Sequence, residues 1–298
     1  MDIFFSLQRE SLQRRNPERL QSWQNDKNAR VMLVHDGQLS IAAEPHYRGL
    51  YALTAQQKSE LILLGLYQGL PTFALRVEHA QFHGEEIAWG DLRQCAHLLD
   101  AETLSIAIQA KALCHWHQTH PFCARCGKPT VMKDAGYRRL CEHCQAEHFP
   151  RCDPAVIVGV QFNGQLLLGR QSGWPEKRYS VIAGFAEPGE SLEQAVVREV
   201  MEEAGIRVKT VRYLQSQPWP YPSSLMLAFM AEAEHDDIEL RDQELENARW
   251  VSRESLQTAM QAGDIKLPPR ASIAYQIIQQ WYEQEGADFA ALIKNVWS

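Results

Sequence analysis

The carboxyl-terminal half of the chain alternates short apolar runs with turn residues, which predicts a sheet. Apolar runs at 155–162 and 165–170 flank Asn163-Gly164, a strong signal for a two-residue β-hairpin. Further strands are expected at 179–183, 208–215, 225–232 and 248–252, and two closing helices at 253–262 and 269–285. This order of elements predicts a mixed sheet between helices.

The amino-terminal third is also rich in strand-like runs. These runs lie at 31–34, 39–42, 61–67 and 72–77, and Asp36-Gly37 predicts a hairpin between the first two. A helical stretch follows at 101–118. We therefore expect a mostly-β domain over residues 1–118, a small module at 119–150 and a second large domain at 151–298.

One further helix is predicted after Ser191. Ser191 and Gln194 have the spacing of a capping box, and Gly205 is placed to end the helix. Between them, apolar residues recur on one stripe of the helix, at Leu192, Ala195, Val196 and Val200.

Three glutamates crowd the polar face of this predicted helix. Glu199, Glu202 and Glu203 stand at i, i+3 and i+4, so their like charges repel unless cations lie among them. Hard oxygen ligands suit Mg²⁺ or Mn²⁺, particularly where the ion also binds substrate phosphates. The alternative is an ordinary solvated acidic face.

Four of the seven cysteines have the spacing of a metal site. Cys123 and Cys126 form one CxxC pair, and Cys141 and Cys144 form another 14 residues later. Four thiolates complete a tetrahedral shell, so the pattern predicts one structural Zn²⁺ per chain. The presence of two such pairs disfavours the rival interpretation, disulfides or a redox site. Few large apolar side chains lie between residues 121 and 150, so this module is expected to need its metal to fold.

The remaining cysteines and a group of three histidines are not expected to bind metal. Cys95, Cys114 and Cys152 have no partner at ligand spacing and are expected to be small buried residues. The histidines near the end of the 101–118 helix fall on mixed faces, so we expect solvated or linker side chains rather than a second metal site at His115, His117 and His120.

A proline-rich segment follows the acidic helix. Residues 216–226 read Ser-Gln-Pro-Trp-Pro-Tyr-Pro-Ser-Ser-Leu-Met, and prolines at alternate positions predict an extended, rigid loop. Trp219 and Tyr221 between them could stack on a flat base or pyridine ring, or could be plain packing residues. The residues alone do not favour either possibility.

Net charge and hydropathy argue against a nucleic-acid-binding surface and a membrane span. A net charge of −7 argues against a broad nucleic-acid-binding surface. The longest apolar run, near 61–66, is far shorter than the roughly 20 residues that a membrane span needs. With no signal-peptide pattern at the amino terminus, we expect a cytoplasmic protein that does not enter membranes.

The spacing from Gly184 to Ile206 resembles the Nudix box of hydrolases that cleave diphosphates. Glu190, the run Arg198-Glu199-Val200 and the pair Glu202-Glu203 occupy its fixed positions. With the four-cysteine module before it and the Gln217–Ser224 segment after it, the chain resembles NADH pyrophosphatases, some of which also remove NAD caps from RNA. The resemblance covers about 101–274 well and the first 90 residues loosely.

The resemblance implies a Nudix α/β/α sandwich with a zinc ribbon, homodimerisation, and dependence on Mg²⁺ or Mn²⁺. It also implies cleavage of NAD(H) to NMN(H) and AMP. As metal ligands it implies the Ala183 carbonyl, Glu199, Glu203 and Glu244, and Glu202 is a further catalytic candidate. The substrate-binding residues that it implies are Arg93, Phe149, Gln217, Pro218, Trp219, Pro220, Tyr221, Pro222, Ser223, Ser224 and Ala274.

Three positions depart from the family pattern. Tyr221 and Phe149 stand where relatives often carry Phe and Tyr, and both changes keep a ring. Gly136 stands where a substrate-contacting Glu is expected, so a hydrogen bond to the substrate would be lost. Substrate preference could therefore differ from the family norm.

The expected reaction is attack by a metal-activated water on the diphosphate, with Glu202 or Glu203 accepting the water's proton. Arg198 and Glu190 are expected to hold the helix and loop in place. Two other functions stay open: a Nudix hydrolase of ADP-ribose or dinucleoside polyphosphates, and a non-catalytic nucleic-acid-binding protein. The complete acidic box and the negative net charge disfavour the latter.

Overall fold

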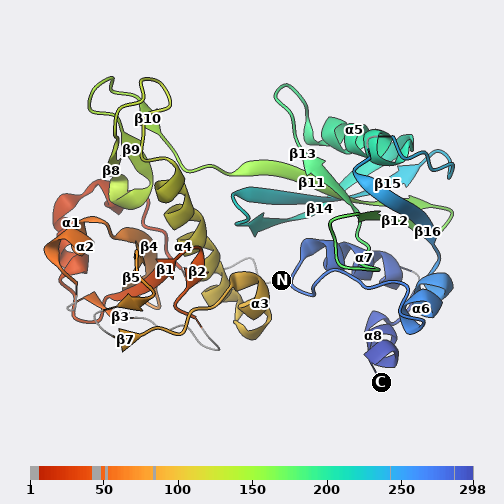
Figure 1. The fold of residues 1–298 in the computed structure, drawn as a ribbon, viewed down its shortest axis with the longest axis horizontal. Coiled ribbons are helices and arrows are strands. Elements are labelled where there is room, and N and C mark those ends of the chain that lie inside the picture. Colours follow the sequence, from red (N-terminus) through yellow and green to blue (C-terminus); the bar gives the residue numbers. More distant parts are fainter. Residues whose placement is uncertain are drawn as a thin grey trace. The chain divides into compact units, whose positions relative to one another are not determined.

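The computed structural model describes residues 7–41, 48–50, 53–82, 85–241, 243–284 and 286–297. The chain forms two compact units, the first made of Met1–Cys152 with Pro220–Ser223 and the second of Asp153–Trp219 with Ser224–Ser298 (Figure 1). No helix among the described residues is long and apolar enough to cross a membrane.

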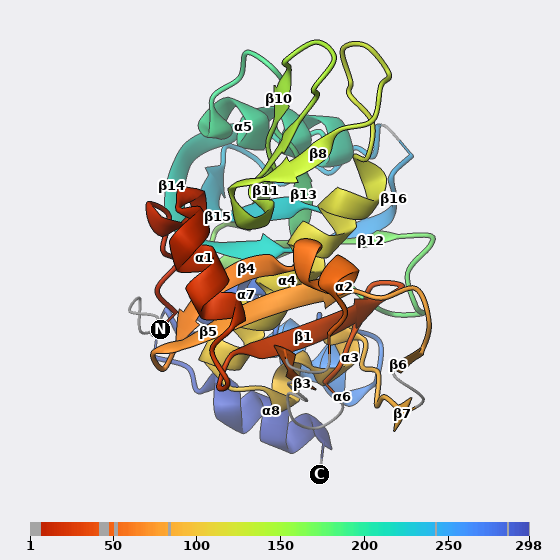
Figure 2. The same cartoon turned by 90° about the vertical axis from the view of Figure 1, so that its left-hand side faces the viewer.

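The first unit is built on a five-stranded sheet (Figure 2). Its strands are β1 (Arg30–His35), β2 (Gln38–Leu39), β3 (Arg48–Gly49), β4 (Ile62–Tyr67) and β5 (Leu70–Arg76). They lie in the order β2-β1-β5-β4, with β3 also paired to β1 and with β1 parallel to β5. The predicted Asp36-Gly37 hairpin is confirmed, since His35 pairs with Gln38 and both turn residues have positive φ. The strand expected at 39–42 is shorter than predicted, and residue 42 lies outside the described part.

Helices cover both faces of this sheet. The predicted long helix is α4 (Ala101–Thr119), and Asp100 caps its first turn. It buries Ile106, Ala110 and Leu113 against one face, whereas Trp23 of α1 (Pro17–Gln24) packs on the other. The unit also contains α2 (Ala55–Ser59), α3 (Leu92–Cys95), 3-10 helices at Gln13–Arg15 and Ala96–Leu98, and the short pair β6 (Gln81–Phe82) and β7 (Glu85–Glu86).

The cysteine module is a small sheet within the first unit. Its strands are β8 (Val131–Lys133), β9 (Arg138–Leu140) and β10 (Glu147–His148), in the order β10-β9-β8, with a 3-10 turn at Asp134–Gly136. Tyr137, immediately before β9, contacts α4 through a hydrogen bond with Gln109. The module therefore packs on the helix that leads into it.

The second unit is a mixed sheet of six strands. These are β11 (Asp153–Phe162), β12 (Gln165–Gln171), β13 (Ile182–Phe185), β14 (Val208–Trp219), β15 (Ser224–Ala233) and β16 (Leu245–Val251). The order is β14-β15-β11-β12-β16, β13 also pairs with β11, and β11 and β15 run parallel. The Asn163-Gly164 hairpin is confirmed by the pairing of Phe162 with Gln165.

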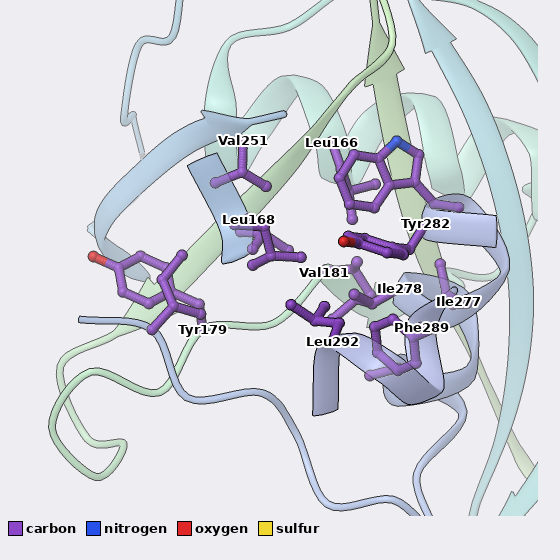
Figure 3. Close-up of a cluster of buried hydrophobic side chains, with 14 of the residues drawn as sticks. Leu166, Leu168, Tyr179, Val181, Val251, Ile277, Ile278, Tyr282, Phe289 and Leu292 are labelled. Atoms are coloured by element: carbon purple, nitrogen blue, oxygen red, sulfur yellow. The ribbon is translucent and has the colours of Figure 1, made fainter. Parts of the chain in front are cut away.

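Helices lie on both faces of this sheet, which confirms the predicted sandwich. One face carries α5 (Leu192–Ala204), and the other carries α6 (Arg253–Gln261), α7 (Ile273–Glu283) and α8 (Phe289–Trp297). In Figure 3, Ile277 and Ile278 of α7 lie beside Phe289 and Leu292 of α8. The expectation of two closing helices was wrong, because α8 is a third. The apolar run at 289–293 is too short to show a helical period in the sequence, and α8 packs on α7 in the structure.

The proline-rich segment is not the extended loop that its prolines predicted. Strands β14 and β15 continue through most of it, with Trp219 paired to Ser224, and only Pro220–Ser223 form the turn. Pro218 lacks an N–H group, but β14 is an edge strand of the sheet, where a missing donor is tolerated. The segment is therefore the tip of a hairpin.

Candidate metal sites and nucleotide-binding residues

The acidic helix begins and ends where local sequence signals place it. The Ser191 hydroxyl accepts from the Gln194 amide at 3.2 Å, and the Gln194 side chain accepts from the Ser191 amide at 2.7 Å. Gly205 ends α5 in the left-handed conformation, at a φ of 69°. Both expectations are confirmed, and they determine which turn of α5 presents each glutamate.

The carboxylate of Glu199 lies directly on the backbone of β13. A Cβ atom added to Gly184 would overlap the Glu199 carboxyl group, so only glycine leaves the space that this side chain occupies. Ala183, whose carbonyl is an expected metal ligand, is the preceding residue on the same strand. Strand β13 therefore brings the expected carbonyl and carboxylate ligands to one place.

The charges around Glu199 are crowded. Burial raises the pKa of Glu199, and the neighbouring charges of Glu202 and Glu244 raise it further, against the lowering effect of Arg198. The late glutamate Glu244, 41 residues along the chain from Glu203, therefore lies within electrostatic range of the helix. A bound cation would relieve this repulsion.

Glu203 does not lie on the solvent face where we expected it. Its exposed fraction is 2%, whereas that of the Glu202 side chain is 54%. Residue 203 lies three positions after Val200 and seven after Val196, so helical periodicity places it on the buried side of α5. The three glutamates thus occupy different depths of one helical turn.

Arg198 joins the helix to the loop before it. Its guanidinium contacts Glu190 at 2.6 and 3.0 Å and donates to the Phe185 carbonyl at 2.8 Å. The same group reaches Glu199 at 2.8 Å and Glu202 at 3.2 Å. The hydrogen bond from Arg198 lowers the pKa of Glu190 to about 2. This geometry fits the expected role of Arg198 and Glu190 in holding helix and loop together.

The donor set at α5 and β13 fits a hydrated Mg²⁺ or Mn²⁺. Carboxylates and a carbonyl are the oxygen ligands that these ions take, and Mg²⁺ commonly keeps several waters. In the described part of the chain, only the cysteine group brings three or more ligand atoms within 4.8 Å of one another. The carboxylates are therefore more widely spaced, which leaves room for water and phosphate oxygens.

The four expected cysteine ligands do converge. The sulfurs of Cys123, Cys126, Cys141 and Cys144 all lie within 4.8 Å of one another. The two CxxC turns repeat one geometry, since Gly127 N donates to the Cys123 carbonyl and Gln145 N to the Cys141 carbonyl, both at 2.8 Å. Backbone amides of Cys144 and His143 lower the pKa of the Cys141 thiol to about 6, which favours a thiolate ligand. The set fits a tetrahedral Zn²⁺ with no open position.

Two expectations about neighbouring residues were wrong. His117 is not a solvated linker residue, because its ring lies between the Gly136 carbonyl and Arg139, at 2.8 Å from each partner atom, and burial lowers its pKa to about 4. Cys152 is exposed rather than buried, since it lies in the connection between β10 and β11. Cys95 and Cys114 are buried as expected.

Gly136 is packed against the amino-terminal sheet. Its φ is 100°, and a Cβ atom there would lie 2.7 Å from Cγ2 of Ile62 on β4. A glutamate would therefore not fit this backbone without rearrangement. The departure from the family pattern changes the packing between module and sheet as well as removing a carboxylate. Phe149, the other departure in this module, is 59% exposed.

Arg93 and Tyr221, both expected to bind substrate, lie together in the first unit. The Arg93 guanidinium lies 4.0 Å from the centroid of the Tyr221 ring. Sequence reasoning missed Lys111 of α4, whose ammonium lies 5.2 Å from the same ring and donates to the Gly37 carbonyl. The available signal was the helix's single lysine, which stands between two alanines. The cluster pairs a half-buried ring with two cations.

Gln217 and Ala274 have clear packing roles in the second unit. The Gln217 side chain donates to the Ala271 carbonyl and accepts from the Ile273 amide, both at 2.7 Å, so it ties β14 to the start of α7. Ala274 is 5% exposed within the core cluster. In the Gln217–Ser224 segment, Pro220 and Ser224 are buried, and Pro218 and Pro222 are exposed. Trp219, Tyr221 and Ser223 are half-buried.

Replacing Gly184 with Ala is expected to displace the Glu199 carboxylate and lower turnover by about 100-fold, because a misplacement of about 1 Å at a reacting centre has that effect. Steady-state kinetics at saturating Mn²⁺ would measure it. Gly173→Ala is the matched control, since its new methyl group meets nothing within 4 Å. Equal activity of both variants would contradict the role given to Gly184.

Comparison with protein families finds three successive matches along the chain. Residues 23–116 match the NADH pyrophosphatase-like rudimentary NUDIX domain, and residues 118–149 match the NADH pyrophosphatase zinc ribbon domain. Residues 152–271 match the NUDIX domain. The strand-rich first domain, the cysteine module and the sandwich described above correspond to these three models in order.

Three curated relatives are similar to part of the chain. The chain is 41% identical over 201 residues to the NAD-capped RNA hydrolase NudC of Mycobacterium bovis, a match covering 64% of each sequence. It is 38% identical to the mouse mitochondrial NAD(P)H pyrophosphatase NUDT13, covering 64% of this chain and 58% of the relative. It is 39% identical to the human NAD-capped RNA hydrolase NUDT12, covering 61% and 42%. The match spans less than two thirds of each relative. The chain belongs to the NudC-type Nudix hydrolases, with an amino-terminal NUDIX-like domain, a zinc ribbon and a NUDIX domain.

Proposed function

We propose that this protein hydrolyses the diphosphate bond of NAD(H) to give NMN(H) and AMP, and removes the NAD cap from RNA 5′ ends. The observation that carries the proposal is the Glu199 carboxylate seated on Gly184, with Glu202 and Glu244 in electrostatic range. The names of the relatives and the NADH pyrophosphatase zinc ribbon point to a dinucleotide substrate rather than a simple nucleotide.

Four groups would hold the catalytic Mg²⁺ or Mn²⁺: the Ala183 carbonyl, Glu199, Glu203 and Glu244. Bound there, the ions would neutralise phosphate oxygens and lower the pKa of a water. Glu202 or Glu203 then accepts the proton of the attacking water. Glu202 is the more accessible of the two, and its carboxylate lies 3.2 Å from the Arg198 guanidinium. Arg198 keeps α5 and the preceding loop in register throughout the reaction.

The nucleotide is proposed to bind along the hairpin tip at Gln217–Ser224, with Arg93, Phe149 and Ala274 as further contacts. The half-buried Tyr221 ring with Arg93 offers both a flat surface and a positive charge, which suit a base and a phosphate. We also propose a homodimer. A cytoplasmic location suits four zinc-binding thiolates, since thiols stay reduced there.

A substrate panel tests the proposed function. One purified sample, loaded with Mn²⁺, is assayed for kcat/KM on NADH, NAD⁺, NAD-capped RNA and ADP-ribose. NADH or NAD-capped RNA is expected to exceed ADP-ribose by at least about tenfold, because a site with groups placed for the nicotinamide half leaves those groups unused with ADP-ribose. Preference for ADP-ribose or dinucleoside polyphosphates would instead support the second candidate function, which Gly136 favours.

A further inference from the structure

A groove in the second unit lies between α7 and α8, on the sheet face opposite α5. Its volume is about 730 Å³, comparable with the space that a nucleotide-sized ligand occupies. Its main lining residues are Arg270, Tyr275, Gln279, Phe289, Ile293 and Lys294. None of these belongs to the catalytic or substrate-binding set described above.

The groove carries two cationic side chains in a chain of net negative charge. Arg270 and Lys294 are both exposed, and neither pairs with an acidic side chain in the part of the chain that the structure describes. Glu283 brings an opposing charge near Tyr275, and its carboxylate accepts from Gln279 at 3.0 Å. Two such cations in a chain of net charge −7 form a local site for anions.

Tyr275 provides a rigid aromatic surface in the same groove. Its ring meets Phe289 edge-on, with centroids 5.3 Å apart and planes at 74°. Phe289 is 2% exposed, so the supporting ring is held in the core, while Tyr275 remains half-buried at the groove. A supported ring in a groove that also carries cations suits single-stranded nucleic acid, because bases stack on the ring and phosphates interact with the charges.

The groove begins beside the proposed substrate segment. Arg270 precedes Ala271, whose carbonyl accepts from Gln217, and Ile273 at the start of α7 donates to the same side chain. The start of α7 therefore connects the hairpin tip that would bind the dinucleotide with the groove that follows along the helix.

We infer that the α7–α8 groove binds the RNA chain that follows an NAD cap, with phosphodiester groups at Arg270 and Lys294 and one base on Tyr275. This inference rests on the proposed function and deepens it. The groove would let the enzyme distinguish capped RNA from free NAD(H), since free NAD(H) has no nucleotide to place there.

The test compares Arg270→Glu, Lys294→Glu and the double variant with the wild type, on NADH and on NAD-capped RNAs of about 2 and about 20 nucleotides. The double variant is expected to lose about tenfold or more in kcat/KM on the longer RNA and less than about twofold on NADH. The slope of log kcat/KM against log salt should become shallower by about 0.7 for each phosphate that the variant no longer neutralises. Lys209→Glu is the matched control, an exposed charge reversal on β14 outside the groove.

Tyr275 gives a second readout that separates stacking from folding. Tyr275→Leu is expected to lower kcat/KM on capped RNA between about fivefold and 100-fold, and Tyr275→Phe to restore it, because the ring is what stacks. Melting temperatures of both variants check that Phe289 keeps its packing.

Each result bears on a different statement. If the groove variants lost activity equally on NADH and RNA, or lost none on either, the inference that the groove binds RNA would be wrong. A wild type that cleaves NADH but not capped RNA would also overturn it, while the NAD(H) part of the proposed function survives. A wild type inactive on both substrates would show that the proposed function itself is wrong.

Discussion

Replacing Glu199 or Glu203 with Gln is expected to lower kcat by about two to three orders of magnitude. Both side chains are proposed to hold the catalytic cation, which supplies several kcal/mol of transition-state stabilisation, and each ~1.4 kcal/mol changes the rate tenfold. An amide keeps the shape of the carboxylate but loses its charge. Single-turnover kinetics on NADH at saturating Mn²⁺ would measure the loss.

The melting temperature of Glu199→Gln is expected to change little. Burial raises the pKa of Glu199 in the folded protein. The contribution of this group to stability is therefore fully present below the pKa of the unfolded chain. That contribution is lost as the pH rises through the pKa of the folded protein. At neutral pH the ionised carboxylate therefore adds no stability that Gln would remove. Arg198 also keeps its two hydrogen bonds with Glu190 in the variant.

Glu193→Gln is the matched control, since it removes an exposed carboxylate from the first turn of the same helix. It is expected to keep wild-type kcat within about twofold, because its only electrostatic loss is a few tenths of a kcal/mol with the helix dipole. Wild-type kcat in Glu199→Gln or Glu203→Gln would show that the metal assignment is wrong.

Replacing Cys123 with Ser is expected to release the zinc and unfold residues 121–150. Cys123 is 3% exposed, and the other three sulfurs surround it. Binding of a structural Zn²⁺ supplies ~10–16 kcal/mol to small zinc modules, so loss of one thiolate removes more stability than the short sheet β8–β10 retains. Metal analysis and limited proteolysis would record both effects.

The damage should extend into the rest of the first unit. Gly136 packs on Ile62 of β4, and Arg139 and the Gly136 carbonyl hold His117 of α4. Loss of the module exposes these groups and lowers the melting temperature of that unit, and it would weaken a dimer built across it.

Cys152→Ser is the control, because Cys152 is exposed and lies outside the ligand set. It should retain one zinc per chain and full activity. The zinc interpretation would be refuted by protein purified under reducing conditions without zinc, or by a folded and fully active Cys123→Ser variant.

The elements that sequence reasoning predicted are those with local causes. The capping box at Ser191, the end of α5 at Gly205 and the turns at Asp36-Gly37 and Asn163-Gly164 are set by contacts within a few residues. The four sulfurs also converge as predicted, since each CxxC turn brings two ligands together within four residues.

The tertiary structure decided the features that depend on distant partners. Glu203 is buried, His117 is held between β9 and the module's turn, and Gly136 faces Ile62, because each environment is formed by an element far along the chain. The proline-rich segment became a hairpin tip because β14 lies at a sheet edge. Burial and pairing come from long-range packing, whereas the local pattern specifies only which turns and helices can form.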